Sequence, residues 1–146
     1  MDFGFAKDMH LAALTVHEFM RAAAIYPIVF IPDGDGYKPV ALTGLQPQEN
    51  VFLDANGQWQ ACYIPASIRR YPFALVKTPT EGEFSIYLDA ENENLKESEG
   101  LDIFTDKDQF SDELTKLTEM LKEHQISDVL TQDFCQRMLK AFLWGR

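Results

Sequence analysis

The stretch that decides the fold reads Tyr26-Pro-Ile-Val-Phe-Ile-Pro-Asp-Gly-Asp-Gly-Tyr-Lys-Pro-Val-Ala-Leu-Thr43. Residues 28–31 form an apolar run of strand length, and residues 37–43 return as its partner strand. The Asp-Gly-Asp-Gly sequence between them is strong turn chemistry, because glycine adopts positive φ freely and aspartate tolerates it. We therefore predict a β-hairpin at this position.

More strands are expected on the C-terminal side of the hairpin. Residues 51–54 and 59–62 flank an Asn-Gly turn, which is a strong short-range hairpin signal. Residues 73–77 and 83–88 make a further pair, after a short helical turn at 66–70. The prediction is a mostly antiparallel sheet over residues 27–88.

Helices are expected on both sides of this sheet. Thr15 and Glu18 match a capping box, so a helix is predicted from residue 16 to about 25, after a weakly ordered segment 1–14 with a short strand at 10–14. Residues 89–102 are predicted to be a solvated loop. Two apolar stripes with helical spacing follow, joined by residues 124–126, and they predict an antiparallel helical hairpin. The stripes comprise Phe110, Leu114, Leu117 and Leu121, then Leu130, Phe134, Met138 and Phe142.

The predicted fold class is therefore α+β: a mostly antiparallel β-sheet with an N-terminal helix and a C-terminal helical hairpin. With 146 residues, 46% of them hydrophobic, the chain has the size of a single domain, 1–146. It contains no run of eighteen apolar residues, so no membrane insertion is expected. No signal peptide is visible at the start of the chain, which favours a cytoplasmic location.

The net charge of −10 is concentrated in one segment. Residues 81–123 carry fourteen acids and four lysines, whereas residues 1–80 carry seven acids and six bases. Such a segment repels phosphates, so no nucleic-acid partner is expected. Its simplest role is to keep the protein soluble, and the alternative is a surface for a divalent cation or a basic partner.

No catalytic residue, metal site or cofactor is predicted. The Asp33-Gly-Asp35-Gly sequence lacks the later ligands of a calcium loop, so a β-turn is the better interpretation. The three histidines show no metal-binding spacing. Cys62 and His17 could meet as nucleophile and base, and Glu49 and Asp54 as an acid–base pair, but a structural thiol and solvated acids are favoured.

One group of residues remains as a candidate ligand-binding site. Arginine stacks on aromatic rings and binds carboxylates through two parallel hydrogen bonds, so arginines among amphipathic aromatics can bind an acidic peptide or a sugar. The alternative is an internal clamp, in which the arginines pair with the acidic segment and the aromatics pack. The candidate residues are Trp59, Tyr63, Arg69, Arg70 and Tyr71.

Over about residues 14–77 the sequence resembles the SapC family of bacterial proteins. The resemblance is carried by Leu14-Thr-Val-His-Glu-Phe19, Tyr26-Pro-Ile-Val-Phe30, Pro39-Val-Ala-Leu42, Leu45-Gln-Pro47, Glu49-Asn-Val-Phe52, Tyr63-Ile-Pro-Ala66 and Ile68-Arg-Arg-Tyr-Pro-Phe73. Family members are generally longer at both ends, so the resemblance implies that this chain is either truncated or divergent.

The resemblance implies a non-enzymatic role, either associated with a surface layer or as an accessory binding protein, and a place at the cell surface. A protein or carbohydrate partner is the corresponding expectation. The alternative is an enzyme, or an enzyme's partner, that acts on a peptide or carbohydrate. The sequence leaves the oligomeric state open.

Overall fold

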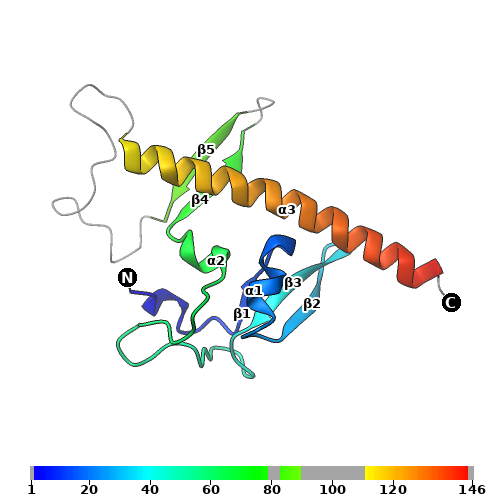
Figure 1. Cartoon of the computed structure of the whole chain (residues 1–146), viewed down its shortest axis with the longest axis horizontal. Coiled ribbons are helices and arrows are strands. Elements are labelled where there is room, and N and C mark those ends of the chain that lie inside the picture. The colour runs from blue at the N-terminus through cyan, green and yellow to red at the C-terminus, as the bar shows by residue number, and fades with distance from the viewer. Residues whose placement is uncertain (1, 79–82, 90–110, 145–146) are drawn as a thin grey trace. The chain divides into compact units, whose positions relative to one another are not determined.

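The computed structural model describes residues 2–78, 83–89 and 111–144 (Figure 1). Contacts divide the chain into two compact units. The first contains residues 1–69 and 126–146, and the second contains residues 70–125. The architecture is α+β, with antiparallel sheets, short helical segments near the N-terminus and a long C-terminal helix.

A three-stranded antiparallel sheet lies at the centre of the first unit, in the order β1-β3-β2. Its strands are β1 (Leu11–Ala13), β2 (Ile28–Asp33) and β3 (Gly36–Leu42). The predicted hairpin is confirmed, since β2 and β3 pair from Ile28↔Ala41 to Asp33↔Gly36. Gly34 has a φ of +58° in the connecting turn, which is why glycine is suited to this position.

Short helical segments lie before, between and after the strands of this sheet along the chain. A 3-10 helix, η1 (Gly4–Ala6), opens the chain. The capping box of Thr15 and Glu18 is confirmed, but it starts a 3-10 helix, η2 (Val16–Glu18), that continues into a single α-turn, α1 (Phe19–Ala22). The helix therefore ends earlier than the predicted residue 25. The short helical turn predicted at 66–70 is present as α2 (Ala66–Arg69).

The core of the first unit includes the start of the chain, which corrects the expectation of a weakly ordered segment. Phe3 is buried, and its amide donates to the carbonyl of Gly57 at 2.8 Å. The N-terminal residues are thus held against the turn at residues 54–57. The buried apolar cluster comprises Phe3, Ala6, Ala12, Leu14, Ala22, Tyr26, Ala41 and Ile68.

The strands predicted at 51–54 and 59–62 are wrong. Only an isolated bridge between Leu53 and Trp59 forms there. Asp54 Oδ1 accepts the amides of Asn56 and Gln58 at 2.9 Å each, and Asn50 Oδ1 accepts the amide of Phe52 at 3.0 Å. These short-range bonds use backbone donors that a strand ladder would need.

The second unit contains its own two-stranded antiparallel sheet. Strand β4 (Phe73–Lys77) pairs with β5 (Phe84–Leu88) from Phe73↔Leu88 to Lys77↔Phe84, as predicted. The predicted single sheet over residues 27–88 is therefore two separate sheets. The predicted acidic loop at 89–102 falls mostly outside the described residues.

The predicted C-terminal helical hairpin is also wrong, because one continuous helix, α3 (Asp112–Trp144), takes its place. Figure 1 shows it as the long yellow-to-red helix. Residues 124–126 contain neither glycine nor proline, so nothing in them breaks the helical hydrogen bonding. In the described residues, no helix is long and apolar enough to cross a membrane.

The C-terminal part of α3 packs on the start of α1 and η2. Phe134 contacts Phe19 edge-on, with ring centroids 5.9 Å apart. The hydroxyl of Thr131 accepts the amide of Val16 at 2.9 Å. Ser127 lies inside α3, and its hydroxyl is 3.0 Å from His17 Nδ1.

Candidate functional site

The predicted aromatic–arginine group is distributed over both units. Trp59, Tyr63 and Arg69 belong to the first unit, whereas Arg70 and Tyr71 belong to the second. No observation on the structure tests whether the five residues bind a ligand, so that assignment stays a prediction.

In the first unit, a chain of hydrogen bonds joins the aromatic side chains. The indole Nε1 of Trp59 donates to the Tyr26 hydroxyl at 2.9 Å, and that hydroxyl donates to the backbone carbonyl of Tyr63. The Trp59 ring is nearly parallel to Phe52, at a 12° interplanar angle and 6.2 Å between centroids. The polar atoms of Trp59 and Tyr26 are therefore engaged within the protein.

A buried carboxylate lies next to these aromatics and joins residues 15–18 to residues 63–66. Glu18 is 6% exposed, and its Oε2 accepts the amide of Thr15 at 2.8 Å and the hydroxyl of the same residue at 3.1 Å. Its Oε1 accepts the Tyr63 hydroxyl and the Ala66 amide, each at 2.7 Å. Four donors thus satisfy the charge of this carboxylate, as a buried ion requires. We call Glu18, Thr15, Tyr63 and Ala66 the Glu18 hub.

The electrostatics of the hub keep Tyr63 protonated. Burial, the hydrogen bond to Glu18 and the negative charge of that residue raise the pKa of Tyr63 to about 12. Burial also raises the pKa of Tyr26. At neutral pH the Tyr63 phenol is therefore protonated and donates its hydrogen bond to Glu18.

Arg69 lies at the exposed edge of the hub. Its guanidinium carbon lies 5.7 Å from the centre of the Tyr63 ring, and its Nε donates to the carbonyl of Ile64 at 3.0 Å. The side chain is exposed, and no carboxylate among the first unit's described residues pairs with it. One edge of a fixed guanidinium is thereby available to solvent.

The remaining two predicted residues lie at the start of the second unit. The hydroxyl of Tyr71 donates to Asp89 Oδ2 at 2.7 Å, which joins the segment before β4 to the residue after β5. Arg70 is half-buried, and its carbonyl accepts the amide of Phe73 at 2.8 Å.

The candidate metal ligands and the two thiols are placed as follows in the described residues. In the part of the chain that the structure describes, no group of three or more His, Cys, Asp or Glu residues could hold a metal ion. Cys62 is exposed and Cys135 is buried, and both are free thiols. Burial raises the pKa of Cys135, which disfavours the reactive thiolate.

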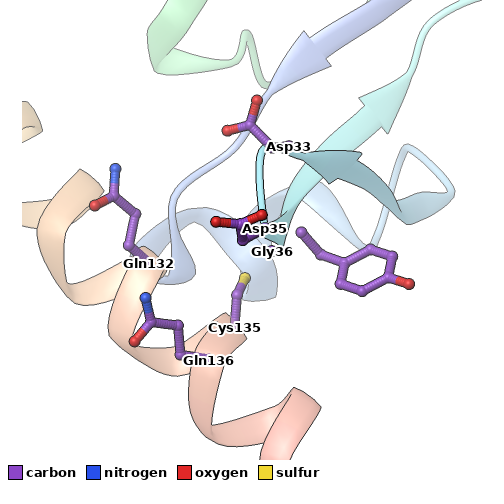
Figure 2. Close-up of a pocket in the computed structure, with 7 residues that line it drawn as sticks. Asp33, Asp35, Gly36, Gln132, Cys135 and Gln136 are labelled. Carbon is purple, nitrogen blue, oxygen red and sulfur yellow. The ribbon is translucent and has the colours of Figure 1, made fainter.

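A depression in the first unit was not predicted. It has a volume of about 260 Å³ and lies between the β2–β3 turn and α3. Figure 2 shows Asp33, Asp35 and Gly36 from the turn facing Gln132, Cys135 and Gln136 from α3. Tyr37 also lines it. We call this depression the turn–helix pocket.

The family of the chain follows from a comparison with protein-family models. The SapC model matches residues 1–144, which is nearly the whole chain. The chain belongs to the SapC family. No curated protein and no solved structure matches the chain.

Membership in SapC extends the resemblance seen at residues 14–77 to the acidic segment and to α3. The turn–helix pocket of this SapC chain was missed because about one hundred residues separate its two sides. One sequence feature could have indicated half of the pocket: Gln132, Cys135 and Gln136 recur at helical spacing, which places them on one side of α3.

Proposed function

We propose that this SapC chain is a non-enzymatic accessory binding protein associated with a bacterial surface layer, and that it binds a carboxylate-bearing protein or carbohydrate. Family membership supports the setting. The observation that carries the binding role is the position of Arg69, which is exposed but held in place by two contacts.

Arg69 is suited to a carboxylate partner because its geometry is already fixed. The hydrogen bond from Nε to the Ile64 carbonyl and the contact with the Tyr63 ring restrict the guanidinium. Tyr63 is itself fixed by its hydrogen bond to Glu18. A planar guanidinium binds a carboxylate through two parallel hydrogen bonds. Because the side chain is restrained before binding, less conformational entropy is lost when the partner arrives.

The state of the hub supports binding over catalysis. Glu18 accepts four hydrogen bonds, so it has no open position from which to take a substrate proton. The pKa of Tyr63, about 12, keeps that phenol protonated at neutral pH. Both groups therefore act as supports for Arg69.

Two arginine variants test this proposal. We expect Arg69→Ala to weaken binding of a short Asp/Glu peptide or of glucuronic acid about tenfold or more, since a hydrogen bond to a charged group contributes about 1.5–3 kcal/mol. Arg137→Ala is the matched control. Arg137 is also exposed and pairs with Asp133 at 2.7 Å within α3, so its removal changes the net charge equally. Titration calorimetry on the full chain measures both.

Capture of isolated surface-layer material on the immobilised full chain, read by mass spectrometry, tests the setting. Arg70→Ala is a third variant, because Arg70 belongs to the predicted group. Equal binding by wild type and Arg69→Ala, with both still folded by circular dichroism, contradicts the role of Arg69. Unfolding of Arg69→Ala or Arg70→Ala supports the internal clamp instead.

A further inference from the structure

We propose that the turn–helix pocket binds an organic cation, an ammonium or guanidinium group carried on an apolar stem. This site is separate from Arg69, and its ligand has the opposite charge. The proposal therefore stands or falls independently of the carboxylate-binding role.

The acidic side of the pocket has one carboxylate that is already paired and one that is not. Asp33 Oδ1 lies 3.1 Å from Lys38 Nζ, and both side chains are about half exposed, at 56% and 45%. Asp35 makes no side-chain hydrogen bond or ion pair with another described residue. No lysine or arginine among the described residues pairs with Asp35, so its negative charge is available to a cation in the pocket.

The helical side supplies neutral polar groups that are equally uncommitted. The carboxamides of Gln132 and Gln136 make no hydrogen bond to another described residue. They come from consecutive turns of α3 and line the same pocket as Asp35 (Figure 2). Each carboxamide oxygen can accept from an ammonium or guanidinium N–H. Together with Asp35 they give a cation three separate side-chain acceptors.

An apolar surface completes the pocket and indicates the shape of the ligand. Cys135 is 5% exposed, its thiol has no hydrogen-bond partner in the described part of the chain, and its sulfur points toward the β2–β3 turn (Figure 2). Tyr37 contributes to the lining as well. A buried, unpartnered thiol behaves as a small apolar group with a weak polar capacity. An aliphatic stem fits against it while the charged head contacts Asp35.

The volume sets the size of the ligand. About 260 Å³ lies slightly below the range of roughly 300–1,000 Å³ that is usual for drug-sized ligands. A lysine or arginine side chain of a partner polypeptide matches this size, and so does a single amino-sugar ring. A metal ion does not match, because the described residues offer no group of three or more metal-ligating side chains.

The test is a titration of the full chain with matched charged and neutral probes. The peptide probes are N-acetyl-Gly-Arg-Gly-amide and its citrulline counterpart, which is neutral and nearly the same shape. The sugar probes are glucosamine and N-acetylglucosamine. Nuclear magnetic resonance shifts of the Gln132 and Gln136 side-chain amides report binding at this pocket and at no other place.

Two variants remove one negative charge each. Asp35→Asn removes the unpaired carboxylate of the pocket, whereas Asp8→Asn removes an exposed carboxylate that does not line it. We expect a charged probe to shift both glutamine amides, and Asp35→Asn to weaken that binding about tenfold or more. The Asp8→Asn variant binds as the wild type does, apart from a small salt-dependent change.

The outcomes separate clearly. Binding of the arginine peptide assigns the site to a basic polypeptide, and binding of glucosamine assigns it to an amino sugar. Equal binding of a charged probe and its neutral counterpart overturns the proposal. So does undiminished binding by Asp35→Asn, or the absence of any amide shift at millimolar probe. None of these results alters the expectation for Arg69→Ala, because that variant is measured with anionic probes.

Discussion

Of the charged residues discussed so far, Glu18 is the one whose replacement is expected to lower the stability of the first unit most. In Glu18→Ala, the buried Thr15 amide loses its acceptor, at about 2–3 kcal/mol. The Tyr63 hydroxyl and the Ala66 amide lose theirs too, but both residues are half-buried and water can replace the carboxylate, so each adds about 0.5–1 kcal/mol. The expected loss is about 3–5 kcal/mol of a total that is usually about 5–15 kcal/mol.

Glu18→Gln is the sharper variant because it keeps the size and shape of the side chain. One oxygen of the carboxamide still accepts two hydrogen bonds, but its NH₂ group faces two donors. We expect a loss of about 2–3 kcal/mol, which reflects the donors left without an acceptor. Glu49→Gln is the control. Glu49 accepts the amides of Leu45 and Gln46 at 3.2 Å in an exposed loop, so its replacement should change stability by less than about 1 kcal/mol.

Urea unfolding measures these differences. A Trp144→Phe background leaves Trp59 as the single tryptophan, so its emission reports on the first unit alone. The midpoint of unfolding should fall for both Glu18 variants and stay nearly constant for Glu49→Gln. If Glu18→Gln unfolds at the same urea concentration as the wild type, the hub does not stabilise the fold and the reasoning above is wrong.

Three further predictions follow from single groups. Because the pKa of Tyr63 is raised to about 12 in the folded protein, the unfolded chain loses this phenol proton first as the pH rises. The free energy of unfolding should therefore fall between about pH 10 and 12, and fall less in Tyr63→Phe. Absorbance at 295 nm during alkaline titration measures the ionisation. Iodoacetamide should modify exposed Cys62 at least about tenfold faster than buried Cys135. Intact-mass spectrometry of the wild type and of Cys62→Ser measures the two rates, and equal rates contradict the burial of Cys135. Gly57→Ala should destabilise by about 2 kcal/mol, because Gly57 has a φ of +71° and an added Cβ, 2.1 Å from Asp2 Oδ1, would force that side chain off the Gly4 amide that it accepts at 2.7 Å. Gly34→Ala also places alanine at a positive φ, but it has open space around it, so thermal unfolding should show a loss of only about 1 kcal/mol.

The parts of the fold that the sequence predicts correctly depend on local chemistry. The Asp-Gly-Asp-Gly turn determines the β2–β3 hairpin, because its residues tolerate the backbone angles that a tight turn requires. The Thr15–Glu18 capping box is likewise a short-range signal, and it starts the helical segment at the predicted residue. The pairing of residues 73–77 with 84–88 follows from two apolar runs and a short connection.

The parts that the sequence does not predict depend on longer-range partners. Trp59 has strand-like neighbours, but its indole bonds to Tyr26, thirty-three residues away, and Asp54 occupies the nearby amides. Ser127 looks like a helix cap, yet it lies inside α3 and contacts His17. In both cases a tertiary contact decides the role of a residue whose local pattern favours another structure.

The candidate site was predictable only in part. The arginine–aromatic composition indicates where a guanidinium could rest on a ring, and Arg69 does lie beside Tyr63. The sequence gives no sign that Glu18 would bind Tyr63, because that contact spans forty-five residues. The same holds for Asp35 and Gln132, which only the folded chain brings to one pocket.

The first unit is assembled from two segments, residues 1–69 and 126–146, that are far apart in the sequence, and this imposes an order on its biosynthesis. The Val16 amide emerges from the ribosome long before Thr131, its acceptor, has been translated. Until then, Phe19 lacks the ring of Phe134 that covers it. The nascent protein must therefore keep an unfinished apolar face from aggregating until the segment that carries Thr131 and Phe134 has been translated.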